Sequence, residues 1–314
     1  MQNLRKQKQV AKAIQSYPVK ESMILIDFLR AELKNMSRNN IKSLLTRKQV
    51  MVDGAPISQY NFVLTPGDIV MIGKYNPQDK PLPTPKILYE DAEFLVIEKP
   101  TGLLTVASDN EKSQTAFRVM MDYVREKDTH ARLYVVHRID RVTSGILMFC
   151  KNEELRDEMQ KQWNSIVSKR GYYAIVDGIP IEKKKTIHTW LHKTSTQIMY
   201  SRQYEDDEGQ EAITHYVVKK EMKSHAFLDV KIDTGRKNQI RVHLKELGHT
   251  VIGDDKYHAV TDPIKRLGLH AYALEFIHPV TEKKYSFFSP LPGLMKAFIE
   301  GRHGVKSTKE EKVS

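Results

Sequence analysis

Residues 134–149 read YVVHRIDRVTSGILMF, and this stretch places charged side chains between two apolar runs. The runs YVV and ILMF are typical of strands, and the polar segment between them is typical of a loop. In that loop a carboxylate, Asp140, lies between Arg138 and Arg141. Charges in a turn often serve solubility alone, whereas a carboxylate held between cations at a cleft stays ionised and can act as a nucleophile. The surrounding sequence has to decide between these two interpretations.

Strand and helix patterns alternate on both sides of this stretch. Consecutive strand patterns are joined by short turn signals such as HPVTEKK, which favour antiparallel pairing, so we predict an α+β domain with a mixed, largely antiparallel sheet. Its central cleft is expected beside the KPTG turn. Strands are expected within 87–105, 172–178, 225–235 and 267–292, and helices within 115–127, 152–163 and 236–248.

Residues 183–213 differ from this pattern because they are polar and contain few apolar positions. A long polar segment inside a compact domain is usually a surface feature. We therefore predict a protruding hairpin or a loop insertion there.

Composition excludes several classes of protein. With 314 residues and 40% hydrophobic content, the chain is long enough for one large domain and a smaller one, and its longest apolar runs are too short to span a membrane. The amino-terminal residues lack the apolar stretch of a secretory signal, so we expect a cytoplasmic protein without a membrane segment, and a monomer. The single cysteine, Cys150, excludes a disulfide framework and a CxxC zinc site within the chain.

The net charge of +11 favours a polyanionic partner, and its distribution is uneven. Residues 1–86 hold 14 Lys and Arg against 6 Asp and Glu, which places eight of the eleven excess positive charges in little more than a quarter of the chain. We expect this part to provide the electrostatic attraction.

The basic region has helical and strand patterns of its own. Leu25, Phe28, Leu29 and Leu33 recur at helical spacing, and a second helix is expected after Ser37, which is a suitable N-cap. The sequence VMV at 50–52 and DIVMI at 68–72 predict two strands. Four cations cluster on or just beyond the second helix, and they form either a solvated face or, as the local charge favours, a surface that contacts phosphates: Arg38, Lys42, Arg47 and Lys48.

This arrangement resembles the small RNA-binding domain named after a ribosomal small-subunit protein, through SRNNIKSLLTRKQVMVDGAPI and LTPGDIVMI. The four prolines that follow indicate a semi-rigid linker. We therefore predict five segments: a basic extension at 1–20, a small helical and β RNA-binding domain at 21–75, a Pro-rich linker at 76–86, a catalytic domain at 87–300 and a charged tail at 301–314.

The larger domain resembles the RluA-type RNA pseudouridine synthases. The motifs HRIDRVTSGILMF, YYAIVDG, TGRKNQIRVH and LHAYALEFIHP occur in the order and at the spacing of that family. A protein kinase also uses an HRD triplet, but the sequence contains neither a Gly-rich nucleotide loop nor a DFG motif. The resemblance implies isomerisation of uridine within RNA, in which the N1–C1′ bond breaks and a C5–C1′ bond forms without a cofactor or a metal.

The resemblance also assigns catalytic roles. Asp140 aligns with the nucleophile, which attacks either C1′ of the ribose or C6 of the uracil, and Arg241 aligns with the arginine that pairs with it, in an expected bidentate contact. Tyr172 matches the tyrosine that stacks on the uracil, and its hydroxyl is a candidate for removing the C5 proton. Its neighbour Tyr173 is a rival, because adjacent strand residues point to opposite faces.

Four further residues are predicted to bind the substrate: Arg138, Arg141, Arg236 and Lys99. In the family the arginine two positions before the aspartate enters the RNA where the base has been flipped out, and the alternative for Arg138 is a phosphate contact. Two positions depart from the family pattern, since Asn238 replaces a usual histidine and Val142 a usual acidic residue. These two departures leave open whether a local hydrogen bond or backbone contact of the family is present, and to which subgroup the sequence belongs.

RNA is the expected partner, with ribosomal RNA favoured over transfer RNA because the amino-terminal module resembles a ribosomal one. A non-catalytic RNA-binding factor for ribosome assembly is the alternative, but it would not need Asp140, Tyr172 and Arg241 together. A glycoside-hydrolysing enzyme would usually need a second carboxylate, and none is apparent in the sequence.

Overall fold

The computed structural model of the chain describes residues 14–34, 36–46, 49–53, 55–73, 84–107 and 115–302. The chain divides into two compact units, residues 1–81 and 82–314. Arg47 and Lys48 lie outside the described residues, as do most of the predicted extension, linker and tail. No helix within the described ranges is long and apolar enough to cross a membrane.

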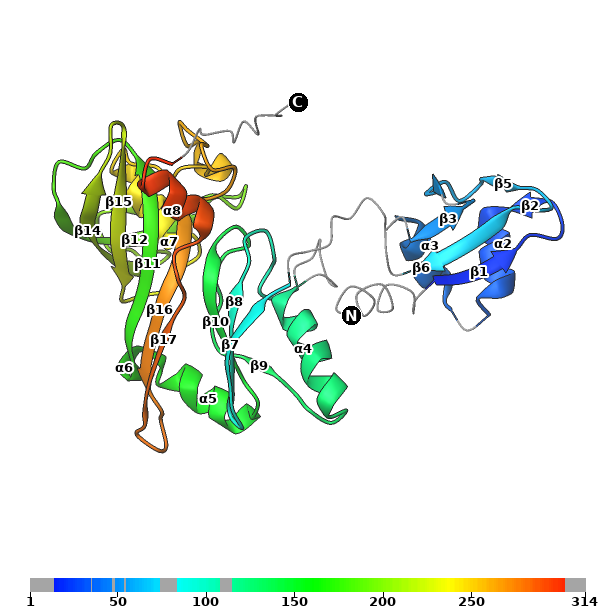
Figure 1. The fold of residues 1–314 in the computed structure, drawn as a ribbon, viewed down its shortest axis with the longest axis horizontal. Helices are drawn as coiled ribbons and strands as arrows, with labels where there is room; N and C mark the ends of the chain where they lie inside the picture. The colour runs from blue at the N-terminus through cyan, green and yellow to red at the C-terminus, as the bar shows by residue number, and fades with distance from the viewer. Residues whose placement is uncertain are drawn as a thin grey trace, which may run out of the picture. The chain divides into compact units, whose positions relative to one another are not determined.

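The smaller unit packs two helices against short strands (Figure 1). The helices begin and end close to the predicted positions, and Ser37 accepts a hydrogen bond from the backbone N–H of Asn40 at 3.3 Å, as an N-cap does. Its elements are β1 (Ile14–Pro18), β2 (Met23–Ile24), α2 (Leu25–Glu32), α3 (Arg38–Thr46), β3 (Val50–Val52), β4 (Ala55–Pro56), β5 (Val63–Leu64) and β6 (Ile69–Gly73).

The smaller unit begins earlier than predicted. β1 pairs antiparallel with β6, from Ile14 opposite Gly73 to Pro18 opposite Ile69. These residues were predicted to belong to the basic extension at 1–20. The pairing with β6 instead makes them the edge strand of the four-stranded sheet β1-β6-β3-β4.

The larger unit is built on one eleven-stranded sheet, in the order β13-β12-β14-β15-β11-β16-β10-β8-β7, with β17 paired to β16 and β9 paired to β10. Its strands are β7 (Lys86–Glu90), β8 (Phe94–Lys99), β9 (Tyr134–Val135), β10 (Ser144–Cys150), β11 (Val167–Asp177), β12 (Lys184–Lys193), β13 (Met199–Arg202), β14 (Gln210–Glu221), β15 (His225–Ile232), β16 (Leu269–Ile277) and β17 (Lys284–Phe288). Its helices are α4 (Ala116–Lys127), α5 (Glu153–Lys161), α6 (Trp163–Ile166), α7 (Gln239–Glu246), the 3-10 turn η1 (Asp255–Tyr257) and α8 (Gly293–Ile299).

One half of this sheet is buried on both faces. Along β8, Phe94 and Val96 pack on the side covered by α5, whereas Leu95 and Ile97 pack on the side covered by α4. Because both faces are covered, the strand reads as a continuous apolar run and does not alternate with polar residues.

In the other half, β11 is also covered on both faces. α7 packs on β11, β14 and β15 from one side, where Ile240 and Leu244 lie against Leu228 and Val230. α8 packs on the opposite face of β11, where Met295 lies near Ile175. The sequence analysis missed α8, since seven residues hold too few turns for a clear helical period.

The two halves meet at a single parallel pairing, between β10 and β16 at Ser144–His270 and Gly145–Ala271. All other strand pairs of the sheet are antiparallel, so the prediction of a mixed, mostly antiparallel sheet is confirmed. Gly145 has φ +115°, and a Cβ there would lie 2.1 Å from the carbonyl oxygen of Ala271. Glycine is therefore required where the halves join, five positions after Asp140.

Residues 183–213 form a hairpin, but they do not protrude as predicted. β12 pairs with β14 and carries β13 on its other edge, so the segment extends the main sheet. Its few apolar side chains are buried with Val242 of α7, including Leu191 and Met199. The polar composition reflects burial of one face only, which is common for antiparallel strands.

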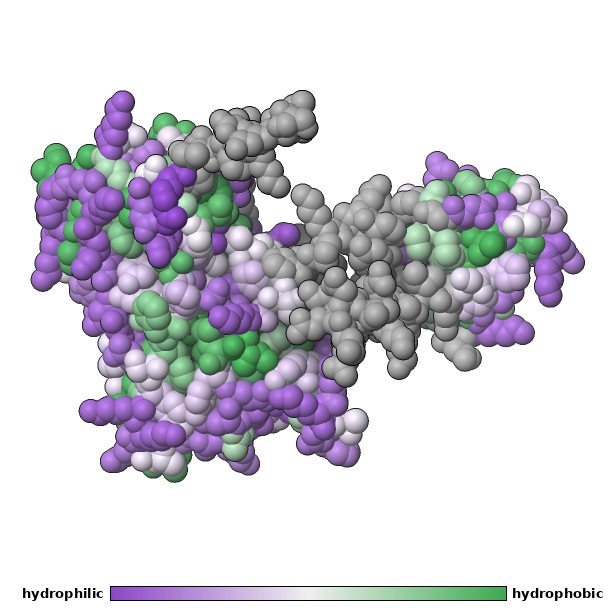
Figure 2. Space-filling model, viewed as in Figure 1, coloured by the Kyte–Doolittle hydropathy of each residue, from purple (hydrophilic) through white to green (hydrophobic). Residues whose placement is uncertain are grey.

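Most of the surface seen in Figure 2 is hydrophilic, and apolar side chains gather over β7 and β17 in the larger unit. Leu88, Tyr89, Phe287 and Phe288 line a pocket of about 460 Å³ there, together with Lys283 and Lys284. This pocket contains no part of the Asp140 loop.

Candidate active site

Asp140 lies in the loop 136–143 between β9 and β10, and a second loop braces it. The carbonyl oxygen of Ile139 accepts a hydrogen bond from Thr105 Oγ1 at 2.8 Å, and that of Val142 accepts one from Thr101 Oγ1 at 2.6 Å. The backbone N–H of Gly102 donates to the carbonyl oxygen of Arg141 at 2.9 Å. These contacts hold the backbone around Asp140 from both sides.

Lys99, which was predicted to bind substrate, is buried and anchors these two loops. Its side chain is fully buried, and Nζ donates to the carbonyl oxygens of Pro100, Leu103 and Arg141 at 3.0, 2.8 and 3.1 Å. Burial lowers the pKa of Lys99 to about 7, while the charge of Asp140 opposes that shift. The KPTG turn therefore connects the loops through an inward-pointing cation.

Arg141, also predicted to bind substrate, lies outside the lining of the pocket that holds Asp140. Its side chain is exposed, and Nε donates to the carbonyl oxygen of Gly102 at 3.0 Å. Of the two arginines around the aspartate, Arg138 is the one that lines that pocket.

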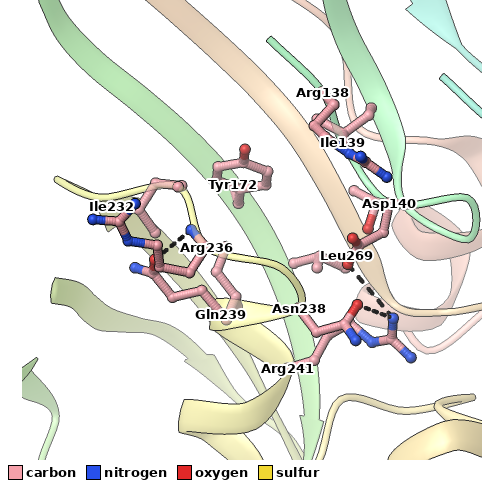
Figure 3. A pocket seen from close by; sticks show the side chains of 13 residues that line it. Arg138, Ile139, Asp140, Tyr172, Ile232, Arg236, Asn238, Gln239, Arg241 and Leu269 are labelled. Carbon is pink, nitrogen blue, oxygen red and sulfur yellow. Dashed lines mark hydrogen bonds and ion pairs between the residues drawn. The ribbon is translucent and has the colours of Figure 1, made fainter. Parts of the chain in front are cut away.

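The Asp140 pocket has a volume of about 60 Å³ and combines residues from both halves of the sheet (Figure 3). It lies where the Asp140 loop, β11, the end of β15, the start of α7 and the start of β16 converge. Its lining consists of Arg138, Ile139, Asp140, Thr143, Tyr172, Ile232, Gly235, Arg236, Asn238, Gln239, Ile240, Arg241 and Leu269.

Asp140 and Arg241 point toward each other in this pocket (Figure 3). Arg241 Nη1 lies 3.5 Å from Asp140 Oδ2, which is a single, long contact. The bidentate contact predicted for Asp140 is instead made with Asp254, at 2.7 Å from Nε to Oδ2 and 2.7 Å from Nη2 to Oδ1. The Asp254 side chain is fully buried, so its charge requires the better partner, whereas Asp140 is 24% exposed.

Asp254 is a further site residue, not predicted from the sequence, and it stands in the stretch LGHTVIGDDKY at 247–257. Besides holding Arg241, its Oδ1 accepts the backbone N–H of Tyr257 at 3.2 Å and so caps η1. The available signal was a GD pair directly after the short apolar segment VI, but it does not indicate that the carboxylate is buried against Arg241.

Asn238 completes the support of Arg241. It adopts a left-handed backbone conformation with φ 57°, its Oδ1 accepts from Arg241 Nη1 at 2.9 Å, and its Nδ2 donates to Tyr257 Oη at 3.0 Å. The asparagine that replaces the usual histidine therefore makes two side-chain hydrogen bonds at this position. The second departure, Val142, packs against the core beneath β11 and β15.

Of the two neighbouring tyrosines on β11, Tyr172 lines the pocket. Tyr173 points to the opposite face, where its ring stacks on Tyr272 with centroids 3.8 Å apart and planes at 8°. Burial raises the pKa of Tyr172 to about 12, with a smaller contribution from the charge of Asp140. Its phenol therefore stays protonated near neutral pH.

Two arginines stand at the rim of the pocket. Arg138 is exposed, and no described residue forms a hydrogen bond or an ion pair with its guanidinium. Arg236 is also exposed, and its Nε donates to the carbonyl oxygen of Glu211 at 2.9 Å. Both lie where an incoming anion would meet them first.

Two histidines near the site form hydrogen bonds with their neighbours. His137 Nε2 accepts the backbone N–H of Met148 at 3.1 Å, and His243 lies between the hydroxyls of Thr189 and Thr214. Burial lowers the pKa of both rings to about 4, so they are neutral at physiological pH. In the described part of the chain no three His, Cys, Asp or Glu side chains are placed to hold a metal ion.

In the smaller unit Arg38 and Lys42 share one face of α3, as their spacing predicts. Together with Arg30 and Ile26 of α2 and with Ile41 they line a pocket of about 170 Å³. Three cations thus converge at one position on the surface of this unit.

Comparison with known proteins agrees with the chemistry of the larger unit. Residues 93–246 match the family model for RNA pseudouridylate synthase. The human protein RNA pseudouridylate synthase domain containing 4 has the same fold, with a TM-score of 0.56 at 22% identity over 67% of this chain and 90% of that chain.

Several relatives are similar along most of the chain. An uncharacterised RNA pseudouridine synthase of Mycoplasma pneumoniae is 30% identical over 88% of this chain and 92% of its own length. The ribosomal large subunit pseudouridine synthase D of Zymomonas mobilis is 31% identical over 71% of this chain and 74% of its own length. This chain therefore belongs to the RNA pseudouridylate synthase family, and it is an isomerase that converts uridine to pseudouridine in RNA.

Proposed function

We propose that this enzyme isomerises specific uridines of ribosomal RNA, with Asp140 as the nucleophile. The observation that carries the assignment is a partly exposed carboxylate beside an arginine that is itself fixed by a second, buried carboxylate. Asp140 is the only carboxylate among the described residues that line the pocket. Its attack at C1′ or at C6 would release the N1–C1′ bond, the uracil would turn, and the C5–C1′ bond would form.

Arg241 has two roles in this scheme. Its fork on Asp254 fixes the guanidinium before substrate arrives, so little conformational entropy is lost during the reaction. Nη1 then contacts Oδ2 of Asp140 at 3.5 Å and leaves its other carboxylate oxygen available for attack.

Tyr172 is assigned to stacking on the uracil. Its phenol, with a pKa of about 12, is a poor general base at neutral pH, so removal of the C5 proton by a phenolate would be costly. We assign that proton to Asp140, which is regenerated once the new bond has formed. The proton balance is closed when N1, no longer bonded to the ribose, takes up a proton.

Arg138 is assigned to the gap left by the flipped base. Flipping costs a few kcal/mol of stacking and pairing, and a planar guanidinium can restore part of the stacking. The side chain is exposed and is not held by any described residue, which leaves it free to enter the RNA.

The smaller unit is proposed to bind RNA in the manner of the ribosomal small-subunit domain that it resembles. Arg30, Arg38 and Lys42 converge on one pocket without an acidic residue in its described lining, which suits a phosphate. Relatives named as ribosomal large subunit synthases favour ribosomal RNA as the target.

Mapping pseudouridines in ribosomal and transfer RNA tests the proposal, using cells that carry the gene, lack it, or carry only Asp140→Asn. One or more ribosomal positions should lose the modification without the gene and should not regain it with the variant. Loss confined to transfer RNA would overturn the ribosomal assignment. Full modification by the variant would exclude Asp140 as nucleophile.

A further inference from the structure

A second and larger pocket adjoins the Asp140 pocket and is not needed by the reaction itself. This Trp163 pocket has a volume of about 340 Å³. Five residues line both this pocket and the Asp140 pocket, so the two are neighbours: Arg138, Tyr172, Ile232, Gly235 and Arg236. RNA that places a uridine at Asp140 would therefore bring its neighbouring nucleotides close to the Trp163 pocket.

The charge of the Trp163 pocket suits an anion. Three arginines line it, Arg138, Arg170 and Arg236, and none of the described lining residues is a carboxylate. Arg170 is held in place, because Nη2 donates to the carbonyl oxygen of Asp233 and because Gly235 leaves room for it. A Cβ at Gly235 would lie 3.0 Å from Arg170 Nη1.

One wall of this pocket is aromatic. Trp163, at the start of α6, is partly buried, and its indole stacks against His137 with ring centroids 5.3 Å apart and planes at 26°. His137 is itself fixed by the backbone N–H of Met148. The indole is thus a positioned, flat surface beside a group of cations, which is the arrangement that holds a nucleobase and its phosphate.

Two amide side chains provide hydrogen-bonding groups at the same place. Gln160 Nε2 donates to the carbonyl oxygens of Val135 and Val136, at 2.9 and 3.4 Å, which leaves Oε1 as an acceptor. Asn164 is exposed and has no hydrogen-bond partner among the described residues. A base edge placed on Trp163 would meet both a donor and an acceptor.

We propose that the Trp163 pocket binds one nucleotide of the substrate RNA that neighbours the target uridine, with its base stacked on Trp163 and its phosphate on Arg170 and Arg236. The inference rests on the proposed function and adds to it a determinant of sequence context. A pocket that reads a neighbouring base would select among uridines that are otherwise chemically identical.

The test uses a synthetic ribosomal RNA fragment with the mapped uridine, and copies in which a single nearby nucleotide is abasic. Wild-type enzyme should convert one of the abasic copies about 10-fold or more slowly than the intact RNA, because a stacked base is lost. Trp163→Ala should be slow on the intact RNA and no slower on that copy. Each variant is compared with itself on two substrates, so a partial folding defect lowers both rates equally and leaves their ratio unchanged.

Trp190→Ala is the matched control. This second tryptophan is also partly buried and also stacks on a histidine, His188, but it lies on β12 outside both pockets. The control should keep the full wild-type sensitivity to the abasic position. Equal sensitivity of Trp163→Ala and wild type at every position would overturn the proposal.

A binding measurement separates this proposal from the proposed function. The chain has two tryptophans, so Trp190→Phe leaves Trp163 as the single indole fluorophore. Binding of the intact fragment should quench its emission, and binding of the sensitive abasic copy should quench it much less. Absent conversion by wild type would refute the choice of substrate, whereas unquenched Trp163 emission on a fragment that binds would refute the nucleotide site.

Discussion

At the scale of single residues, Asp140 is the side chain on which turnover should depend most. Asp140→Asn keeps its shape and removes the charge, so release of tritium from C5 of uridine in RNA should fall below detection while RNA affinity stays within about two-fold. Stability should change by less than about 1 kcal/mol, because the contact with Arg241 is long and partly exposed. A residual rate near that of wild type would show that the nucleophile is another group.

Asp254→Asn tests the support behind the nucleophile. Arg241 would keep one acceptor on position 254 but lose the buried countercharge, so the free energy of unfolding should fall by about 3 kcal/mol in denaturant titrations. At a temperature where the variant is folded, kcat should fall while KM changes little, since Arg241 would no longer hold Asp140 in line. A variant as stable as wild type would contradict the proposed arrangement.

Tyr172 distinguishes stacking from proton transfer. Because burial raises its pKa to about 12, the hydroxyl should be dispensable as a base, and Tyr172→Phe should retain turnover within about 10-fold. Tyr172→Ala removes the stacking surface and should lose at least about 100-fold. Single-turnover rates on the mapped RNA measure both. A Phe variant as inactive as Asp140→Asn would assign an essential role to the hydroxyl.

The site residues that belong to a family motif could be predicted from the sequence. The side chains with which they interact could not. Asp140, Tyr172 and Arg241 do meet in one pocket although the first and last are 101 positions apart. The bidentate contact of Arg241 with Asp254 could not be predicted, because the carboxylate that pairs with an arginine is determined by burial in the folded state. The burial of Lys99 could not be predicted for the same reason, since a lysine at the end of a strand is exposed far more often than buried.

At the scale of elements, periodic segments were predicted well and weakly patterned ones were not. α2, α4 and α7 carry apolar residues at helical spacing and appear where expected. The hairpin of β12 and β13 was taken for a surface insertion because its partner surface, α7, lies later in the chain. When a segment is buried by an element that lies far away in the chain, the sequence of the segment itself gives little indication of that burial.

The Glu90 carboxylate at the end of β7 connects this strand with α4 and with the residue after β10. These contacts make the stability of the larger unit sensitive to acid. The carboxylate accepts from Lys151 Nζ at 2.9 Å after β10, and from Tyr123 Oη at 2.7 Å and Lys127 Nζ at 3.0 Å on α4. Burial alone would raise its pKa, but the hydrogen bonds from Lys151, Tyr123 and Lys127 lower the pKa of Glu90 from 4.5 to about 2. The carboxylate is therefore held more tightly in the folded protein than in the unfolded chain.

The sign of the effect follows from this lowered pKa. The contribution of Glu90 to stability is complete above pH 4.5 and is lost as the pH falls from 4.5 toward 2. Glu90→Gln should lower the free energy of unfolding at pH 7 by about 1 kcal/mol, because exposure of the lysines reduces the gain. Urea titrations of both proteins from pH 7 downward should show the difference shrink below pH 4.5. A constant difference would contradict the ion-pair assignment.

At the scale of the whole molecule, the division into two units implies a division between affinity and chemistry. The boundary falls at residues 81 and 82, within the Pro-rich segment, and the basic residues 1–86 carry eight of the eleven excess charges. Each of two such units is expected to fold by itself. Deletion of residues 1–75 should therefore leave a larger unit that unfolds at the denaturant concentration of the corresponding transition in the full chain.

The same deletion should weaken RNA binding and make it less sensitive to salt. Each phosphate contact that is lost removes roughly 0.7 to 0.9 from the slope of log affinity against log salt concentration, because fewer counterions are released. The full-length variant Arg38→Gln/Lys42→Gln is the matched control, and its slope should fall by roughly one to two without any loss of chain. Turnover at saturating RNA should stay close to wild type in both, since Asp140 and its supports lie in the larger unit. If the deletion leaves the slope unchanged, the positive charge of the smaller unit does not meet RNA, and the unit instead contacts a protein.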